Sequence, residues 1–211
     1  KSFRNYTEND GLPSNDVWSI LVDSRGTLWV GTLEGLCRLE GETFALYDLP
    51  ESEPDPTRGV TSARIVHCIM EDSLGRLWFA GNAGVNIWDG KSLRNLSEAD
   101  GLCNNSVNCM LEDGNGAIWF ATHHNGICRY DGERFTHFGE ADGLHGIEAW
   151  NLYQDRSGNI WFPLENGGLY RYDGSAFQNV PDPEGKILGA IQDTFQDRKG
   201  RVWAGGYMGL F

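Results

Sequence analysis

Short apolar runs separated by turn residues follow one another along this chain in a pattern that repeats. In the first repeat, the apolar run Val17–Val22 leads to Asp23, and Thr27–Thr32 forms the next run. Two more short runs, Leu36–Leu39 and Thr43–Tyr47, complete the repeat. Runs of this length bounded by Gly, Asp and Asn are typical of β-strands and too short for helices. The pattern predicts a unit of four antiparallel strands.

One phrase marks each repeat: an Asp-x-x-Gly turn followed by a strand that contains Trp. The Trp residues of the five copies are Trp29, Trp78, Trp119, Trp161 and Trp203. After the first interval, which the insertion Pro50–Gly59 lengthens, the copies recur about every 42 residues, within the ~40–50 residues of a β-propeller blade. We therefore predict an all-β fold, a β-propeller of four-stranded antiparallel blades centred on these five residues.

The two ends of the chain suggest how such a ring could close. The last repeat supplies three strands and ends at Phe211, while Phe3–Tyr6 precede the first repeat as outer strands precede the later ones. Pairing of this N-terminal strand with the last blade would leave no open sheet edge. We predict one domain over residues 1–211 with five blades closed in this way. The alternative is an arc of a larger ring, within a longer chain.

Composition and charge narrow the class of protein. The net charge is -13, with 17 Lys and Arg against 30 Asp and Glu, which argues against nucleic-acid binding. No apolar run is long enough to span a bilayer, and no signal peptide is visible. The chain begins at Lys1, as a processed protein or an excised piece would. The five Cys residues form no C-x-x-C pair and read as small buried hydrophobic residues, so the compartment stays open.

Repeated residues indicate the frame, and departures from repetition indicate candidate sites. The five repeated Trp residues, and Trp88 on a third strand, are expected to pack between sheets. The loops after the second and fourth strands vary, so we expect any binding on that face. When the first strands of the repeats are aligned on their closing Asp, the position five residues before it holds a mixed row of Trp, His and amide side chains. The position four residues before the Asp adds two more polar candidates. The candidate ligand-binding residues are Trp18, His67, Asn108, Trp150, Asn151, Gln192 and Asp193.

Indole faces and amides suit a small polar ligand, such as an oligosaccharide, or a peptide. The other interpretation is that the two indoles pack between blades and the amides bind channel water. On the loop face, the candidates are His123, His124, Asn125 and Tyr207. Adjacent residues on a strand point to opposite faces, so the His pair is a poor chelate and we expect no metal or cofactor. The turn at Asp113 lacks the further oxygen ligands of a calcium loop.

Two other functions stay open. A glycan-active enzyme would need two carboxyls about 5–9.5 Å apart. Asp16, Glu148 and Asp193 are the carboxylates of the first strands above the closing Asp, and Glu148 with Asp193 is the conceivable pair. No nucleophile, phosphate-binding or zinc-protease motif is present, so we assign no catalytic residue and expect no enzyme. A protein-interaction scaffold would favour basic partners because the chain is acidic. The oligomeric state is left open.

The residues of the first repeat resemble a known family. The segment YTENDGLPSNDVWSILV, followed by DSRGTLWVGTLEGLCRL, is similar to the two-component regulator propeller repeat, and the likeness recurs throughout the chain. The resemblance implies a sensor β-propeller of the periplasmic region of bacterial histidine kinases and hybrid receptors, often tuned to carbohydrate breakdown products. It implies a non-enzymatic, ligand-sensing role in signal transduction, an extracytoplasmic location, and membrane attachment only through regions absent from this chain.

Overall fold

The computed structural model describes residues 2–52, 62–146, 148–182, 184–207 and 209–211. The chain forms two compact units: unit 1 comprises Lys1–Ser97 and Asn105–Val107, and unit 2 comprises Glu98–Asn104 and Asn108–Phe211. Most of the predicted insertion Pro50–Gly59 lies outside the described residues. Three short 3-10 turns in the described part are η1 (Glu8–Asp10), η3 (Glu98–Asp100) and η4 (Glu140–Asp142). All other regular structure described is β-strand.

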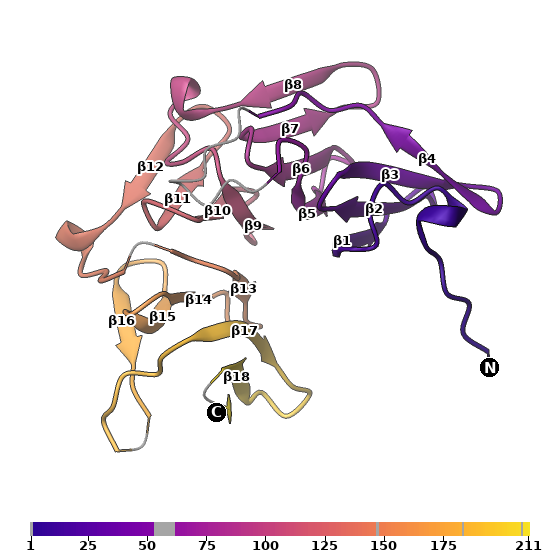
Figure 1. Ribbon diagram of the computed structural model, residues 1–211. Helices are drawn as coiled ribbons and strands as arrows, with labels where there is room; N and C mark the ends of the chain where they lie inside the picture. Colours follow the sequence, from indigo (N-terminus) through magenta and orange to yellow (C-terminus); the bar gives the residue numbers. More distant parts are fainter. Residues whose placement is uncertain (1, 53–61, 147, 183, 208) are drawn as a thin grey trace. The chain divides into compact units, whose positions relative to one another are not determined.

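Unit 1 holds two antiparallel four-stranded sheets in which each strand pairs with the next along the chain (Figure 1). The strands of the first sheet are β1 (Val17–Val22), β2 (Leu28–Thr32), β3 (Gly35–Glu40) and β4 (Thr43–Tyr47). Those of the second are β5 (Val66–Glu71), β6 (Leu77–Gly81), β7 (Val85–Trp88) and β8 (Leu93–Leu96). Each sheet corresponds to one sequence repeat.

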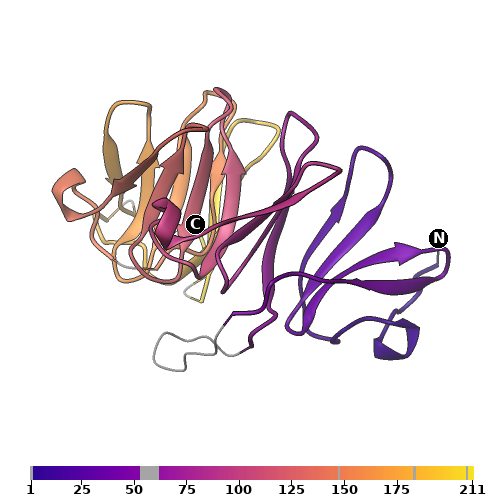
Figure 2. The same ribbon diagram turned by 90° about the horizontal axis from the view of Figure 1, so that it is seen from above.

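Unit 2 contains three sheets of the same design (Figure 2). The first consists of β9 (Val107–Glu112), whose first residue is counted with unit 1, β10 (Ile118–Thr122), β11 (Ile127–Tyr130) and β12 (Phe135–Phe138). The second consists of β13 (Tyr153–Gln154), β14 (Ile160–Leu164), β15 (Gly168–Tyr172) and β16 (Phe177–Val180). The third consists of β17 (Ile191–Gln196), β18 (Val202–Gly206) and β19 (Gly209–Leu210). The prediction of an all-β fold built from repeated antiparallel blades is confirmed.

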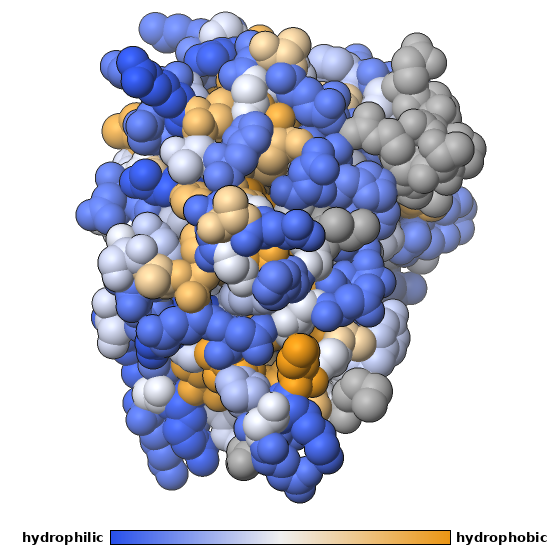
Figure 3. All heavy atoms as spheres, turned by 90° about the vertical axis from the view of Figure 1, so that its left-hand side faces the viewer, coloured by the Kyte–Doolittle hydropathy of each residue, from blue (hydrophilic) through white to orange (hydrophobic). Residues whose placement is uncertain are grey.

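Buried side chains between successive sheets form the core of each unit. In unit 1, Trp29 and Leu36 of the first sheet pack with Val66 and Ile69 of the second. In unit 2, Trp119 packs in one cluster that also contains Leu152 and Phe162 from the next repeat. The outer strands β12 and β16 expose their two middle residues, and hydrophilic side chains predominate on the face in Figure 3. The apolar area is thus concentrated between the sheets.

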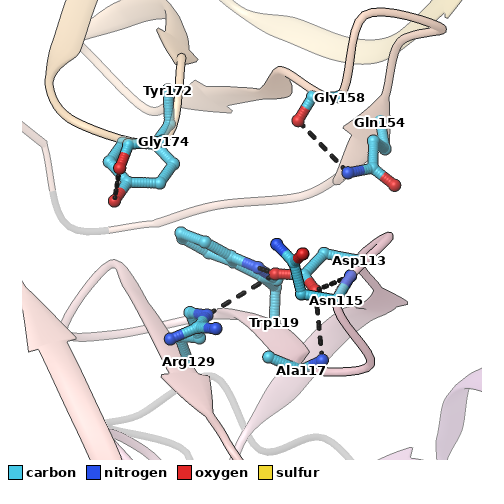
Figure 4. Close-up of polar contacts among 9 residues, drawn as sticks. All are labelled: Asp113, Asn115, Ala117, Trp119, Arg129, Gln154, Gly158, Tyr172 and Gly174. Atoms are coloured by element: carbon cyan, nitrogen blue, oxygen red, sulfur yellow. Dashed lines mark hydrogen bonds and ion pairs between the residues drawn. The ribbon is translucent and has the colours of Figure 1, made fainter.

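A hydrogen-bonded pair of Asp and Trp recurs in every sheet and explains the repeated phrase. The indole N–H of each Trp donates to Oδ2 of the Asp six residues earlier, at 2.7–3.1 Å. The other carboxylate oxygen accepts from backbone amides two and four residues on, as Asp113 does from Asn115 and Ala117 (Figure 4). The Gly of the turn takes a positive φ, such as 81° at Gly116. One carboxylate therefore closes the turn and orients the core indole.

The same hydrogen bonds shift the acidity of these carboxyls. At Asp113 burial raises the pKa, but the bonds from the Trp119 indole and the turn amides outweigh it and hold the pKa below its usual value. Asp23 and Asp155 show the same direction of shift. The turns therefore stay ionised and intact at neutral pH. The prediction that the repeated Trp residues form the frame is confirmed for Trp29, Trp78 and Trp119, which are buried.

A β-bulge in the first strand of the sheets affects the row of candidate residues. The pairing shifts by one residue between Val17 and Ser19, Val66 and Cys68, and Ile191 and Asp193. Trp18, His67 and Gln192 are the residues bypassed by these shifts. The Ala149–Leu164 bridge and the Tyr153–Trp161 pair differ by the same one-residue step. A bulge re-aims a side chain out of the regular alternation, which distinguishes this row from the apolar row before it.

The prediction that the N-terminal strand completes the last sheet stays a prediction. Residues 3–6 form no strand, and in the described part of the chain the last sheet has three strands. Instead, the Tyr6 ring packs edge-on against Phe44 at 5.4 Å, and Arg4 forms an ion pair with Glu42. These contacts attach the N-terminal segment to the first sheet. The blade count of a closed ring stays a prediction.

The interpretation of all five Cys residues as simple buried hydrophobic groups is wrong. Cys103 and Cys128 form a disulfide in unit 2. It joins the loop before β9 to the middle of β11. The sequence did not predict this pairing, because the two Cys residues are 25 positions apart. Cys37 is buried outside any disulfide, and burial raises the pKa of its thiol to about 11, as expected for a small hydrophobic side chain.

Candidate functional site

The residue directly after the second strand of a sheet lies beside the residue seven positions before the closing Asp. Backbone hydrogen bonds fix this neighbourhood: Glu165 N donates to Glu148 O at 2.8 Å, and Leu33 N donates to Asp16 O at 2.9 Å. The fold therefore brings one variable loop position next to one variable strand position in each of these repeats. What chemistry results depends on the residues that occupy the two positions.

In unit 2 these positions assemble a titratable cluster. Glu148 is only 8% exposed, and its buried Oε1 contacts Nδ1 of His123, which follows β10. The Glu165 carboxyl and the Asn108 amide of β9 both lie near enough to affect the pKa of the Glu148 carboxyl. The Nδ2 group of Asn108 additionally donates to Ala149 O at 2.9 Å. Polar groups from three separate parts of unit 2 thus lie around one buried carboxyl.

Burial and neighbouring charge make this carboxyl unusually weak as an acid. Desolvation, followed by the hydrogen bond and charge of Glu165, raises the pKa of Glu148 to about 7, against the opposing effect of Asn108. Burial lowers the pKa of His123, and the nearby His124 lowers it further, while Glu165 opposes this. The structure therefore places an imidazole with a lowered pKa beside a carboxyl with a raised pKa. Such a group can donate or accept a hydrogen bond.

An exposed indole borders the cluster. Trp150 is 37% exposed, and its ring meets the His123 ring edge-on at 6.1 Å. The His124 ring lies 4.6 Å from that of His123, and Asn125 adopts a left-handed backbone with φ 69°. The Asn125 amide donates to Cys103 O at 2.9 Å. The disulfide-bonded loop therefore anchors the turn that carries both His residues. We name Asn108, His123, Glu148, Trp150 and Glu165 the carboxyl–indole cluster.

Unit 1 contains two further candidates of the mixed row. The Trp18 and His67 rings meet edge-on at 5.1 Å, and Trp18 is 45% exposed. His67 Nε2 lies 3.4 Å from Asn82 Oδ1, which also accepts from Ser106 Oγ at 2.7 Å. Asn82 follows β6 as His123 follows β10. This aromatic pair therefore has amide and hydroxyl neighbours where the carboxyl–indole cluster has an imidazole and carboxyls.

Other candidates lie outside these two groups. Asn151 Oδ1 accepts a hydrogen bond from Thr194 Oγ1 at 3.1 Å, so this amide links two sheets of unit 2. Gln192, Asp193 and Tyr207 are exposed. Asp193 accepts from the Thr194 amide. The carboxyl that raises the pKa of Glu148 is that of Glu165, which is not among the candidate residues of the sequence interpretation. Whether these candidates bind a ligand stays a prediction.

Glu165 and Thr194 were missed because the sequence alignment considered strands and loops separately. Glu165 occupies the same position after its second strand as Asn82 and His123 do after theirs. Pairing that loop position with the position seven before the closing Asp would have joined Glu165 to Glu148. Across the described ranges, no group of three or more His, Cys, Asp and Glu side chains is arranged to hold a metal ion.

Comparisons with known proteins agree on the type of repeat. The sequence model of the two-component regulator propeller family matches residues 11–34, 59–83 and 101–124, which lie in the first three repeats. A protein of Formosa agariphila named histidine kinase P4 is 44% identical over 45 residues. That match covers 21% of this chain and 3% of the kinase. The likeness recognised in the sequence is therefore confirmed for the repeat itself.

Solved structures share the fold at low identity. The extracellular domain of a protein described as a hybrid two-component system of B. thetaiotaomicron has a TM-score of 0.79 and 22% identity. The alignment covers 98% of this chain and 30% of that one. Virginiamycin B lyase of Staphylococcus aureus has a TM-score of 0.64 and 17% identity, covering 90% of this chain and 63% of the lyase. This chain thus spans less than a third of the two-component structure, and the shared fold also occurs in a lyase.

Among the described residues, no helix has the length and apolarity needed to cross a membrane.

Proposed function

Since this chain carries two-component regulator propeller repeats, we propose that it belongs to the extracytoplasmic sensing region of a two-component receptor and binds a small polar ligand. An oligosaccharide is the class we favour. The observation that carries the proposal is the carboxyl–indole cluster, which combines an exposed Trp150 ring with the Glu148 carboxyl and the Asn108 amide. Indoles stack on the apolar faces of sugars, and carboxyls and amides bond to hydroxyl groups.

The disulfide supports the proposed location. Disulfides persist in oxidising compartments such as the periplasm and are rare in the cytosol. The Cys103–Cys128 bond lies in the loop region that supports the cluster. The fold shared with an extracellular domain of a two-component system supports the same location.

Calorimetry with a panel of neutral and acidic oligosaccharides tests the proposal. We expect at least one to bind, and we expect Trp150→Ala and Asn108→Ala to weaken that binding about tenfold or more, as loss of a stacked ring or a bonded amide would. Trp88→Phe is the matched control because Trp88 lies on β7 in unit 1, outside both candidate groups. Absence of binding across the panel, or equal loss in the control, would reject the proposal.

A glycan-active enzyme is the second candidate, favoured by the Glu148 carboxyl alone. A buried carboxyl whose pKa is raised to about 7 suits a general acid. Glycoside hydrolysis also needs a second carboxyl about 5–9.5 Å from the first, whereas the neighbouring Glu165 acts on Glu148 by raising its pKa. We therefore propose a binding role without catalysis. Release of reducing sugar from any glycan, lost in Glu148→Gln, would reverse this choice.

A protein-interaction scaffold would use the same face with a peptide or a basic protein as ligand. Stable capture of such a partner, together with silence across the oligosaccharide panel, would favour that function over sugar sensing.

A further inference from the structure

A pocket of about 310 Å³ lies within unit 2, between the sheet of β13–β16 and the last sheet, β17–β19. None of the residues that line it belongs to the carboxyl–indole cluster. The pocket is about twice as large as the ~150 Å³ apolar cavity that holds a benzene molecule, so it has room for two fused rings. Its lining includes Trp161, Leu169, Val180, Asp182, Ala204 and Phe211.

A small residue of the last sheet leaves part of this space empty. The position directly after the repeated Trp holds Phe in the three middle repeats and Ala204 in the last. Where two sheets pack in unit 1, the Phe79 ring at this position lies 5.5 Å from the Trp29 ring. In unit 2, Trp161 packs against a cluster in which Ala204 brings only a methyl group. Trp161 is accordingly half-buried, whereas Trp29 is buried.

A second ring is missing on the fourth strand of the sheet of β13–β16. On β12, the corresponding residue is Phe138, whose ring stacks on the Trp119 ring at 5.4 Å. On β16, this position holds Val180, which pairs with Leu169 of the third strand. Two positions that carry rings beside the repeated Trp in other repeats therefore carry small side chains beside Trp161, and the pocket is the space that those rings would fill.

The acidic side chain of the pocket belongs to a further copy of the Asp-x-x-Gly turn. Asp182 Oδ1 accepts from Glu184 N at 2.9 Å and from Lys186 N at 2.7 Å, as the turn carboxylates of the repeats accept from amides two and four residues on. In every repeat, the other carboxylate oxygen accepts the indole N–H of a Trp six residues on. After Asp182 that position holds Leu188. This turn therefore supplies no indole donor to Oδ2 of Asp182.

We propose that this pocket binds a small planar aromatic molecule that carries an N–H or O–H donor, with an indole as the best fit. The rings of the ligand take the space that aromatic side chains fill between other sheets, and they pack against Trp161. The donor bonds to the second oxygen of Asp182, and the charge on this acceptor strengthens the bond. An apolar pocket with one polar group of this kind is the usual design of a small-molecule site. It is a second site, separate from the one proposed for the oligosaccharide.

Calorimetry with indole tests the binding, and 1-methylindole, which lacks the N–H group, tests the donor. We expect indole to bind saturably and 1-methylindole to bind about tenfold more weakly, as loss of a hydrogen bond to a charged group would cause. Asp182→Asn keeps one oxygen for the turn amides. It should weaken the binding of indole about tenfold and leave that of 1-methylindole unchanged.

Two variants fill the pocket with the residue that other repeats have at the same position. Ala204→Phe and Val180→Phe should each abolish the binding of indole, while the midpoint of thermal unfolding stays at or above the wild-type value and shows that the variant is folded. Ala176→Phe, on the exposed turn between β15 and β16, adds the same ring outside the pocket. This matched control should leave the binding of indole unchanged.

Absence of saturable indole binding to the wild-type protein, or binding that survives in both filling variants, would overturn the proposal. Equal affinities for indole and 1-methylindole would overturn the role of Asp182. Concentration-dependent association of the ligand-free protein in the ultracentrifuge, lost in Ala204→Phe, would assign the pocket to a second copy of the chain instead. The oligosaccharide panel does not bear on this site, so failure of the proposed function and failure of this proposal are distinguishable.

Discussion

The same two positions of successive repeats hold different chemistry in the two units. In unit 1, Asn82 follows the second strand and its amide oxygen accepts from Ser106, seven residues before the next closing Asp. In unit 2, the corresponding residues are His123 and Glu148, and they form a titratable contact. The backbone arrangement is set by the repeat. The repeated backbone therefore brings the same two positions together in both units. The residues at those positions determine whether the contact contains titratable groups.

The two units also share an aromatic contact beside these positions. Each unit places a half-exposed indole edge-on to an imidazole, Trp18 with His67 in unit 1 and Trp150 with His123 in unit 2. In unit 1 the imidazole faces an amide. In unit 2 it faces a carboxyl. We therefore expect ligand recognition in unit 2 to depend on pH, and the unit 1 pair to be insensitive to carboxyl ionisation.

The largest expected effect separates frame indoles from candidate indoles. Trp119 is 1% exposed and bonds to Asp113, so Trp119→Ala should lower the free energy of unfolding by about 3–5 kcal/mol. Trp150→Ala removes a ring that is 37% exposed and should cost less than about 1 kcal/mol. Urea unfolding of both variants measures the difference. Similar losses for the two would mean that Trp150 belongs to the frame.

The next effect concerns the disulfide that unit 2 has and that the described part of unit 1 lacks. Cys103→Ser with Cys128→Ser should lower the free energy of unfolding by about 3 kcal/mol, given the sequence separation of 25. The Asn125 contact with Cys103 should loosen as well, which would broaden the His123 and His124 signals in NMR spectra. Cys68→Ser, outside the disulfide, is the control. Unchanged stability of the double variant would show that the bond does not constrain the fold.

A smaller effect follows from the raised pKa of Glu148. Between its ordinary pKa of 4.5 and about 7, the folded protein holds a proton that the unfolded chain releases. Stability is therefore highest below that range and falls as pH rises through it. Glu148→Gln removes this slope, so at pH 8 the variant should be more stable than the wild type by about 2 kcal/mol. Denaturant unfolding at pH 4, 6 and 8 measures it. A slope retained in the variant would assign the effect elsewhere.

The smallest expected effect comes from a substitution that makes the unit 1 group resemble the unit 2 cluster. Asn82→Asp places a carboxylate beside His67, which should raise the pKa of that imidazole by about one unit. An NMR titration of the His67 ring measures the shift. Glu34→Gln, in the corresponding loop of the first sheet, is the control. No shift at His67 would show that the neighbourhood of the two positions does not control ionisation.

The fold could be predicted from the sequence because its determinants are local and repeated. An Asp, a Gly and a Trp at fixed spacing specify a turn, its positive φ and a core ring, and five copies reinforce one another. The hydrogen bond from the Trp indole to the Asp was not foreseen, since it depends on how the ring lies over the turn. The contact of the Tyr6 ring with Phe44 was not foreseen either, because the sequence pattern of the N-terminal segment carries no signal for a particular aromatic partner.

The site was predicted less completely for a related reason. Alignment of single strands identified Trp150, His67 and Asn108, because each departs from a repeated position. The Glu148–Glu165 pair and the Cys103–Cys128 bond depend on contacts between segments far apart in sequence. Alignment of single strands does not show these contacts; the first needed a loop position to be paired with a strand position, and the second joins two different repeats. The β-bulge that aims the candidate row was likewise invisible, since a single inserted register step leaves no residue signature of its own.

The most direct test of ligand binding at the carboxyl–indole cluster uses the indole N–H signals of ¹⁵N-labelled protein. Five of these N–H groups are bonded to the turn carboxylates and serve as internal references. On addition of a neutral oligosaccharide at pH 8, the account predicts that the Trp150 signal shifts in a saturable manner while those five stay in place. A Trp150 signal that remains unmoved by every oligosaccharide, or that shifts no more than the five references, would contradict it.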